Sequence, residues 1–584
     1  IDPLTAERME VLRGPAVLLF GGQAIGGAVN VIDRRIPRSV PKEGHHFDVI
    51  AGLASAADER SVGGAVDIAA GGGLVLHADA SLRKSDDLRA GGYVLSPDLR
   101  AEQFEIAAEE LDEGHPQEAE EALELADLRG EIPNSATEQK SAGLGAALIR
   151  DRFNIGASVS LFDSQYGVPM RPGAEHHHGE EGGEEEEAGE EEHGAAPVSI
   201  DLRQLRADLR GEYKFDSGFL DGIRLRVGAA DYEHTEFEGE EVGTVFKSSG
   251  LEGRLELVQR DRDGWRGATG AQYFRRDFKA VGAEAFLPPN KTSQAGLFTL
   301  QEFEIGPFGA EASARVERTR ADAHTLDIER DFTALSAAAG ASYALAEHVE
   351  AGVNLSRTER APSAEELFSN GPHIATQAFE VGNPDLKKER SLGAEAYFRI
   401  DRRAFELSLT AFANWFDDFI YESATGEERD ELPVFQYFQR DATYYGFEAE
   451  VTRHLFDAGG FRIVGDAVAD YVRATVKGVG PVPRIPPLRL LGGLEAQSDR
   501  LDARAEVEWV GDQDRVADFE TPTDGHTLVN ASLAWRPWGK ARETSLVLSA
   551  NNIFDADARR HASFTKGFVP MAGRDIRLSA RFSF

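Results

Sequence analysis

The segment that decides the fold reads Glu7-Arg-Met-Glu-Val-Leu-Arg-Gly-Pro-Ala-Val-Leu-Leu-Phe-Gly-Gly-Gln-Ala-Ile-Gly-Gly-Ala-Val-Asn30. Its short apolar runs, 9–12, 17–20 and 28–32, are separated by Gly-Pro and Gly-Gly pairs. Each run is shorter than an ordinary helix, and the glycines permit backbone angles closed to other residues. The pattern therefore predicts tight buried turns between short strands. A phosphate-binding loop is the other interpretation, but the Lys-Ser/Thr ending of that motif is missing.

Composition narrows the class of protein. The chain has 584 residues and no cysteine, so disulfides, thiolate metal sites and cysteine nucleophiles are excluded. Its 101 acidic and 63 basic residues give a net charge of −38, which argues against nucleic acid and favours cations as partners. No apolar run is long enough for a membrane-spanning helix, and mean hydropathy is −0.36. A transmembrane β-barrel stays possible, because its strands show lipid only every second residue.

After residue 37 the chain shows repeated two-residue alternation of apolar and polar side chains. Examples are 74–83, the hairpin 144–162 with its turn at 151–152, and the hairpin 391–413 with its turn at 401–403. One apolar and one polar face, with tight turns at one end and long polar loops at the other, is typical of an outer-membrane barrel. A string of soluble β-sandwiches would use the same alternation. Its apolar faces would carry large residues, whereas here they often carry alanine.

The C-terminus favours the barrel. Apolar residues alternate with polar ones from Ile576 to the terminal Phe584, and a final strand ending in phenylalanine resembles the assembly signal of bacterial outer-membrane proteins. The segments 551–555 and 573–574 resemble the closing part of TonB-dependent outer-membrane receptors. The opening segment resembles the last part of the plug domain of the same family, through Glu10, Val11, Gly14, Pro15, Gly21, Gly26, Gly27 and Asn30.

This resemblance implies an architecture and a location. We expect an all-β fold, a 22-stranded antiparallel transmembrane β-barrel in the lipid of the bacterial outer membrane. Residues 1–36 are then the C-terminal remnant of a plug inside the barrel, and residues 37–584 are the barrel itself. The chain would be a fragment whose upstream part carries the segment that docks a TonB-type energy-coupling protein.

Two acidic segments interrupt the alternation and are expected as extracellular loops. Residues 101–131 are acidic, with scattered leucines and little β-branching, which predicts a loop with some helix. Residues 173–194 contain ten glutamates and four histidines without a lysine or arginine. Such a segment cannot bury apolar surface and is expected to be disordered without a ligand.

The second loop has the composition of a metal-capture segment. Imidazole and carboxylate groups suit Zn²⁺, and also Ni²⁺ or Cu²⁺. The imidazoles come from His176, His177, His178 and His193. A flexible loop would hold cations in several weak, exchanging ligand sets and release them below about pH 6, where the histidines protonate. The alternative is a solvated charge run with incidental histidines.

A second candidate site lies at 231–246. His234, Glu236, Glu238 and Glu240 share a parity, so an extended strand places them on one face as a possible metal ladder. The same row is also what the water-facing side of a barrel strand would look like.

The third candidate segment is 360–391. Arg360-Ala-Pro and 382–391 resemble segments found across TonB-dependent receptors. The sequence Gly-Pro-His-Ile-Ala-Thr at 371–376 and Phe-Glu-Val-Gly-Asn at 379–383 resemble the zinc-uptake receptors of this superfamily. That resemblance implies a buried site built from an Asp-His pair in the plug, which would lie upstream of Ile1, together with Glu and His from the barrel. His373 and a glutamate of 236–241 are the candidates, and an ordinary loop histidine is the alternative for His373.

These observations predict a receptor that takes up Zn²⁺ or a related divalent cation and has no prosthetic group. Haem receptors of the superfamily carry a Phe-Arg-Ala-Pro box and an Asn-Pro-Asn-Leu box around a histidine. Here Glu359 replaces the Phe of the first box, and Asp385 replaces the second Asn of the other box. A haem or metal-chelate (siderophore) receptor is therefore the alternative. A non-transporting surface metal-binding protein would not need the plug glycines. No G-x-S-x-G, H-E-x-x-H or Walker motif occurs, so we expect no enzyme.

Overall fold

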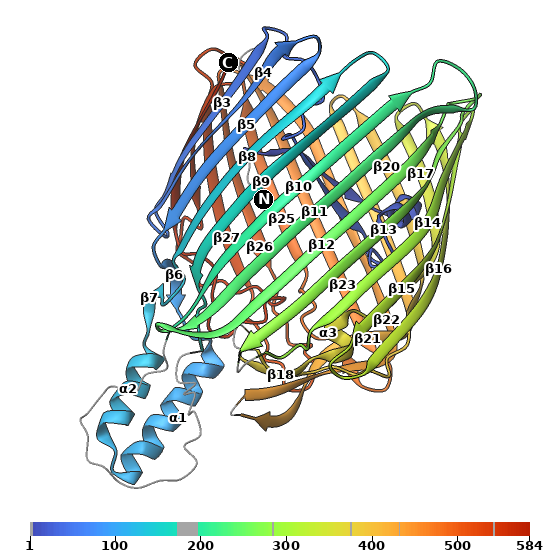
Figure 1. Cartoon of the computed structure of the whole chain (residues 1–584). Coiled ribbons are helices and arrows are strands. Elements are labelled where there is room, and N and C mark those ends of the chain that lie inside the picture. Colours follow the sequence, from blue (N-terminus) through green and yellow to red (C-terminus); the bar gives the residue numbers. More distant parts are fainter. Residues whose placement is uncertain (1–3, 172–196, 283–284, 374–375, 431, 541–542) are drawn as a thin grey trace.

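The computed structural model describes residues 4–171, 197–282, 285–373, 376–430, 432–540 and 543–584. It shows a closed antiparallel barrel whose wall is formed by 22 strands, as the sequence predicts (Figure 1). The wall strands are β3 (His45–Ala54), β4 (Glu59–Gly71), β5 (Leu74–Ser85), β8 (Thr137–Ile149), β9 (Phe153–Gly167), β10 (Val198–Lys214), β11 (Leu220–Glu238), β12 (Glu241–Gln259), β13 (Trp265–Gly282), β14 (Asn290–Ile305), β15 (Phe308–Ala323), β16 (Ile328–Ala346), β17 (Val349–Arg360), β20 (Glu389–Arg402), β21 (Phe405–Arg429), β22 (Leu432–Ala458), β23 (Phe461–Val476), β25 (Arg489–Gln497), β26 (Leu501–Val510), β27 (His526–Trp535), β28 (Ser545–Asn551) and β29 (Asp575–Ser583).

The remaining elements lie inside the barrel or at its ends. They are β1 (Ala6–Leu12), η1 (Gly14–Phe20), β2 (Ala28–Asp33), β6 (Leu88–Tyr93), α1 (Pro97–Glu113), α2 (Pro116–Ala126), β7 (Arg129–Ile132), α3 (Ala364–Phe368), β18 (Asn370–His373), β19 (Ala378–Val381) and β24 (Gly480–Pro481). None of the helices in the described part of the chain is long and apolar enough to cross a membrane.

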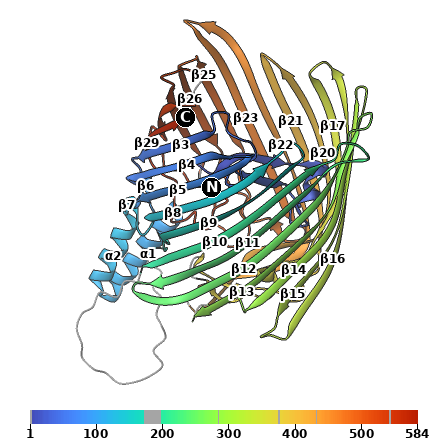
Figure 2. The same ribbon diagram turned by 45° about the horizontal axis from the view of Figure 1, so that its top comes forward.

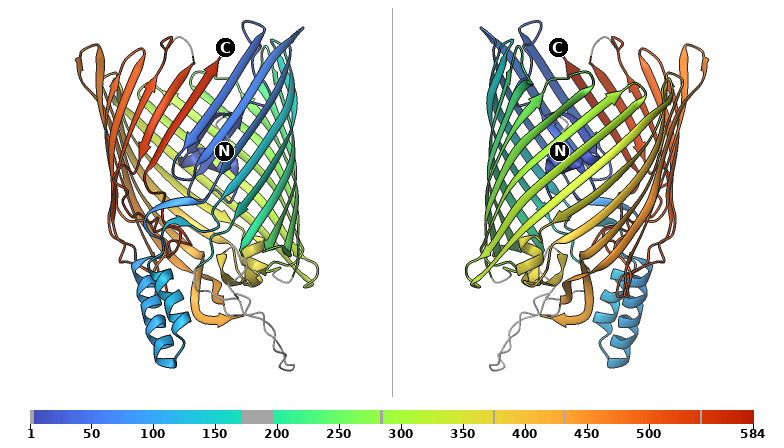
Figure 3. Two further views of the ribbon diagram at one scale, coloured as in Figure 1. Left: turned by 90° about the vertical axis from the view of Figure 1, so that its left-hand side faces the viewer. Right: turned by 90° about the vertical axis from the view of Figure 1, so that its right-hand side faces the viewer.

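The two ends of the barrel differ in their connections. At one end, the short-turn end, consecutive strands are joined by tight turns such as Gly72-Gly73 and Gly459-Gly460, where both glycines have positive φ. Other residues seldom adopt such angles, so glycine makes these reversals possible. At the opposite end, the long-loop end, lie α1, α2, α3 and the β18–β19 hairpin (Figure 3).

The barrel is closed by pairing between its last and first strands. In the β29–β3 ladder Phe582 lies opposite Val49, and Phe584 exchanges backbone hydrogen bonds of 2.9 and 3.0 Å with Phe47. The alternating C-terminal segment is therefore the closing strand. Because this pairing leaves neither strand as a free edge, the backbone polar groups of the wall are satisfied around the whole circle.

The outer face of the wall is apolar and has an aromatic girdle at the short-turn end. Leucines such as Leu335 and Leu355 point outward and are more than half exposed. Near the short turns Trp265 stacks on Phe303 at 5.9 Å and meets Phe219 edge-on at 5.8 Å. An apolar band edged by aromatic rings fits a lipid bilayer, in which the rings lie at the headgroup level.

The N-terminal elements lie in the lumen (Figures 1 and 2). β1 and β2 pair antiparallel, and Asn30 donates a 2.8 Å hydrogen bond to Glu10, which lies opposite it in the ladder. From the wall, Ser313 donates to the carbonyl of Pro15 at 2.6 Å, and Arg254 donates to the carbonyl of Leu19. These contacts fix the segment to β12 and β15.

The middle apolar run of this segment differs from the expectation of turns between short strands. Residues 14–20 form the 3-10 helix η1, which buries Pro15, Val17 and Leu18. Proline is well suited to a first helical position, and Gly14 and Gly21 have positive φ and let the chain turn at either side. A seven-residue 3-10 helix is shorter than the windows in which helical periodicity can be detected.

The acidic segment 101–131 contains the expected helix. α1 and α2 form a hairpin that projects from the long-loop end (Figure 3). The Ser96 hydroxyl caps α1 by accepting from the backbone N–H of Leu99, and Gly114 ends α1 in the left-handed region.

An arginine placed on the apolar outer face should weaken the barrel according to its depth. Leu355, on β17, is 60% exposed, whereas Leu326 is 49% exposed in the β15–β16 connection at the long-loop end. We expect Leu355→Arg to lower the free energy of unfolding in lipid vesicles by about 2–4 kcal/mol, and Leu326→Arg by about 0–1 kcal/mol. Urea titration measures both. Equal costs at the two positions would contradict the assignment of this face to lipid.

Candidate functional site

The first candidate site is a histidine–glutamate pair on the β18–β19 hairpin at the long-loop end. His373 Nδ1 lies 2.7 Å from Glu380 Oε1, and Thr376 donates a 3.2 Å hydrogen bond to the same carboxylate oxygen. The ring of Phe286 stacks on the His373 ring at 4.2 Å. β19 also pairs in parallel with β22, which fixes the hairpin to the wall.

The contacts of His373 leave one ring nitrogen for a ligand. When the Nδ1–H is donated to Glu380, the tautomer is fixed with the lone pair on Nε2. In the described part of the chain Nε2 makes no hydrogen bond. A carboxylate behind one nitrogen of a histidine is the arrangement that orients metal-binding histidines.

The second candidate site is a histidine–glutamate pair on β11. His234 Nε2 lies 3.5 Å from Glu236 Oε1, and Glu236 is only 4% exposed. The imidazole stacks on Phe246 at 4.4 Å. His234 Nδ1 is buried without a hydrogen-bond partner, and so is the hydroxyl of Thr244, which lies opposite Glu236 in the β11–β12 ladder and is 0% exposed. Buried polar atoms without partners are costly, and a bound cation or water that they contact would remove that cost.

The two pairs belong to one aromatic cluster but not to one ligand set. Phe246 and Phe286 lie 6.1 Å apart between the two histidines, within the same hydrophobic core. This arrangement therefore does not place His373 and Glu236 around a single ion. Within the described ranges, the group of three ligand atoms lying within 4.8 Å of one another is Glu110, Glu113 and His115 at the exposed tip of α1–α2.

The other predicted residues have different surroundings. Glu238 is the last residue of β11 and follows a register shift between Glu236 and Phe237, and Glu240 is exposed in the next turn, so the four predicted residues do not form one regular row. His176, His177, His178 and His193 lie outside the described residues. Sequence reasoning did not single out Glu380, Thr244, Phe246 or Phe286 as ligands or supports. Glu380 lies in the segment 379–383, and Thr244 and Phe246 lie in 231–246, whereas Phe286 lies in none of the candidate segments.

Hydrogen bonds hold the described chain on both sides of the histidine-rich segment, and one side contacts the hairpin of the first pair. The backbone N–H of Arg171 donates to Gln377 of the β18–β19 hairpin at 2.8 Å, and its guanidinium pairs with Glu102 of α1 at 2.5 Å. On the other side Asn134 donates to the carbonyls of Val168 and Val198 at 2.8 and 2.6 Å. The chain before residue 172 is thus held beside the β18–β19 hairpin, and Asn134 joins Val198 to Val168 on the other side.

A buried polar cluster ties the loops of the long-loop end together. Glu520 accepts from Lys566 at 2.9 Å and contacts His561 at 3.2 Å, and His561 in turn contacts Thr523 at 2.9 Å. Burial raises the pKa of Glu520, but hydrogen bonds from His561, the backbone of Ala517 and Lys566 outweigh it and lower the pKa to about 2. The cluster therefore holds the β26–β27 and β28–β29 loops together through an ionised carboxylate.

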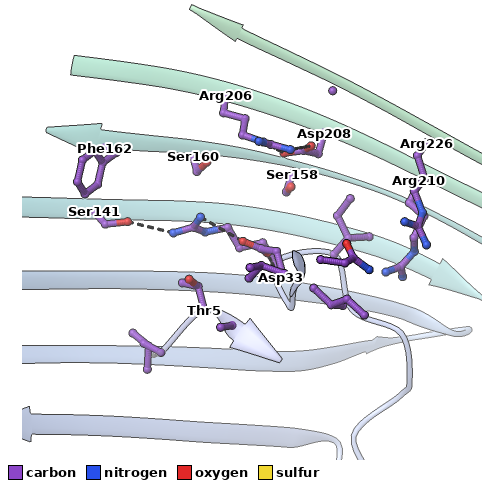
Figure 4. Close-up of a pocket in the computed structure, with 18 of the residues that line it drawn as sticks. Thr5, Asp33, Ser141, Ser158, Ser160, Phe162, Arg206, Asp208, Arg210 and Arg226 are labelled. Atoms are coloured by element: carbon purple, nitrogen blue, oxygen red, sulfur yellow. Dashed lines mark hydrogen bonds and ion pairs between the residues drawn. The ribbon is translucent and has the colours of Figure 1, made fainter. Parts of the chain in front are cut away.

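The lumen contains a basic cavity of about 1260 Å³ between β1–β2 and the wall (Figure 4). Ten basic side chains line it against six acidic ones. Arg206 pairs with Asp208 at 2.7 Å, and Figure 4 shows Arg210 and Arg226 close together. Four of the ten basic side chains also pair with carboxylates beside the cavity, so its walls are rich in guanidinium groups but carry little net charge; these pairs are Arg35–Asp79, Arg38–Glu7, Arg83–Glu59 and Lys140–Glu138.

Comparisons with known proteins match the whole architecture. The family model described as TonB dependent receptor-like, beta-barrel matches residues 190–553. Among solved structures, the copper transporter OprC is 17% identical with a TM-score of 0.77, and the match covers 100% of this chain and 87% of that chain. The FrpB iron transporter from Neisseria meningitidis (F3-3 variant) is 14% identical with a TM-score of 0.75, and the match covers 100% of this chain and 88% of that chain. The siderophore receptor PirA from Pseudomonas aeruginosa is 14% identical with a TM-score of 0.66, and the match covers 100% of this chain and 88% of that chain. At these identities the likeness establishes a shared fold.

The Glu520 cluster predicts how loop packing depends on pH. Because its folded pKa is below the unfolded value of about 4.3, the stabilisation is complete above that value. It should then be lost as the pH falls toward about 2. Hydrogen exchange of residues 511–525 and 552–574, corrected for intrinsic rates, should show protection falling through this window. Glu520→Gln should lower protection at pH 6 and remove the dependence. An unchanged pH profile in that variant would contradict the assignment.

Proposed function

This chain belongs to the TonB-dependent receptors, whose barrel model matches residues 190–553, and on that premise we propose that it takes up Zn²⁺ or a related divalent cation such as Ni²⁺ or Cu²⁺. The fold is characteristic of the bacterial outer membrane, and receptors of this family are transporters and not enzymes. The copper and iron transporters among the similar structures support a metal cargo in general.

The observation that carries the proposal is the His373–Glu380 pair. The carboxylate of Glu380 orients the imidazole, and Nε2 is left to bind an ion arriving from the long-loop end. A neutral imidazole backed by a carboxylate is a good donor for Zn²⁺, Ni²⁺ and Cu²⁺. The β18–β19 hairpin thus offers an outer station for the cation.

The His234–Glu236 pair is the second station. It is more deeply buried, and the partnerless Nδ1 of His234 and hydroxyl of Thr244 offer further donors. Phe246 and Phe286 separate the two pairs, so a cation would pass from one to the other past these rings. We propose that the aromatic pair keeps water and ions from flowing freely between the stations.

The histidine-rich segment is proposed as the capture loop. Arg171, which precedes it, is held by Gln377 and Glu102 next to the outer station. Carboxylates and imidazoles tethered there raise the local concentration of loosely bound cations near His373. The acidic net charge of the chain adds a long-range attraction for cations.

Release inward is proposed to follow the mechanism of the family. In this proposal residues 1–36 are the end of the plug, and residues 37–584 are the barrel with its loops. A TonB-type protein that pulls on the plug from the other side would rearrange this segment. The wall contacts of Pro15 and Leu19 are among those that such a movement has to break.

One observation favours a second function, the uptake of an anionic metal chelate. The basic luminal cavity would attract negatively charged siderophores or haem propionates after they pass the mouth. The similar siderophore receptor PirA makes this the natural alternative.

Calorimetric titration of the chain in detergent micelles distinguishes these functions. We expect Zn²⁺, Ni²⁺ or Cu²⁺ to bind more tightly than haem or a ferric siderophore. His373→Ala should weaken cation binding about 10- to 100-fold. The control His348→Ala changes an exposed histidine in a short turn and should have no effect.

Deleting 173–194 should reduce the number of weak cation sites while leaving the His373-dependent one. Tight binding of haem or a ferric siderophore, together with only millimolar affinity for Zn²⁺, would favour the chelate receptor over the cation receptor. A surface protein without transport would bind none of these through His373.

A further inference from the structure

A second carboxylate lies on the same face as the His373–Glu380 pair. Glu422 belongs to β21, and its side chain is 14% exposed. In the ladders Glu380 lies opposite Phe435, and Phe435 lies opposite Ala424. Side chains of directly paired residues, and those two apart on one strand, point to the same side of a sheet. Glu380, Ala424 and Glu422 therefore share one face.

The charges of this face interact. Glu422 interacts electrostatically with Glu380, which repels it, and with His373. Two carboxylates in a half-buried site raise each other's free energy unless a cation lies near both. The site thus has the electrostatic character of a place for a cation.

A positively charged side chain, that of Arg484, already lies beside Glu422. Arg484 lies in the β24–β25 connection, and its guanidinium is 3.4 Å from Glu422 Oε2, the one ion pair that Glu422 forms in the described part of the chain. Charge-assisted hydrogen bonds are usually about 2.7–2.9 Å long, so this pairing is loose. The guanidinium also lies 5.2 Å from the ring centre of Phe564, which offers it a second position.

We propose that Glu422 joins His373 as a ligand of the cation, with Glu380 behind the imidazole, and that Arg484 is a resident counter-ion which the incoming divalent cation displaces. This inference rests on the proposed function and names a further part of the same site. A divalent ion neutralises both carboxylates, whereas Arg484 neutralises only one. Displacement moves Arg484 toward Phe564.

The displaced arginine is connected to the loop cluster described above. Its backbone N–H donates to Glu520 at 2.8 Å, and its φ of 60° is in the left-handed region, which is unfavourable for an arginine. Movement of the side chain can therefore proceed while the backbone stays fixed to the β26–β27 loop. The cation site and the loops of the mouth are linked through this one residue.

The test is calorimetric titration with Zn²⁺ of the full chain and two charge-removing variants. Glu422→Gln should weaken Zn²⁺ binding at least tenfold, because a ligand and its charge are lost. Arg484→Gln should strengthen binding roughly threefold to tenfold, because the competing cation is gone. In the double variant the gain from Arg484→Gln should disappear, since its cause is the charge of Glu422.

Controls separate this effect from general electrostatics and from misfolding. Arg440→Gln removes the same charge from an exposed position on β22 and should change the affinity less than twofold. Arg484→Lys should bind Zn²⁺ as the unaltered chain does. Should Arg484→Gln fail to form the heat-modifiable folded band, Arg484→Met, which keeps the aliphatic stem, takes its place.

The inference predicts opposite effects of Arg484→Gln and Glu422→Gln on the affinity for Zn²⁺. If Arg484→Gln and Glu422→Gln both weaken binding, the two residues merely support the loop and the inference is overturned. If both leave the affinity unchanged while His373→Ala abolishes it, the cation receptor stands and only this inference fails. If His373→Ala leaves Zn²⁺ binding intact, the proposed function itself fails.

Discussion

Closure of the sheet is the constraint on which the rest of the structure depends. In lipid no water is present to satisfy a free strand edge, so β29 has to pair with β3 and the wall has to form a complete circle. Once the circle is closed, alternate side chains face a lumen that is shielded from the bilayer. This is why so many charged residues can lie on membrane-spanning strands, and why the N-terminal segment can be held there by side chains from β12 and β15.

The lumen and the mouth differ in their electrostatics, and this difference organises the proposed transport. The mouth gathers carboxylates and imidazoles at His373, Glu380 and Glu236, and its loops are locked by a buried ionised Glu520. The lumen beneath is dominated by arginines. In the proposed transport a cation is thus attracted to the entrance, and its inward passage follows the rearrangement of the plug-like segment.

Much of the fold follows from the sequence, because alternation and glycine-punctuated turns are local signals. The C-terminal alternation predicted the final strand, and the plug-like motif predicted a segment inside the barrel. The structure adds that β29 closes the barrel and that Glu10 and Asn30 contact each other. The candidate site was harder to predict from the sequence. The spacing of His234 and Glu236 shows in the sequence because they are two apart on one strand. The contribution of Thr244 depends on the β11–β12 register, and that of Phe286 on the packing of a distant connection. Arg484 and Glu422 meet only through tertiary structure.

The most direct measurement of the central claim is anomalous diffraction at the zinc absorption edge from crystals of this chain grown with Zn²⁺. The account predicts a peak about 2.0–2.1 Å from His373 Nε2, the usual length of a bond between zinc and imidazole nitrogen. Peaks confined to the exposed group of Glu110, Glu113 and His115, with none at His373, would contradict it.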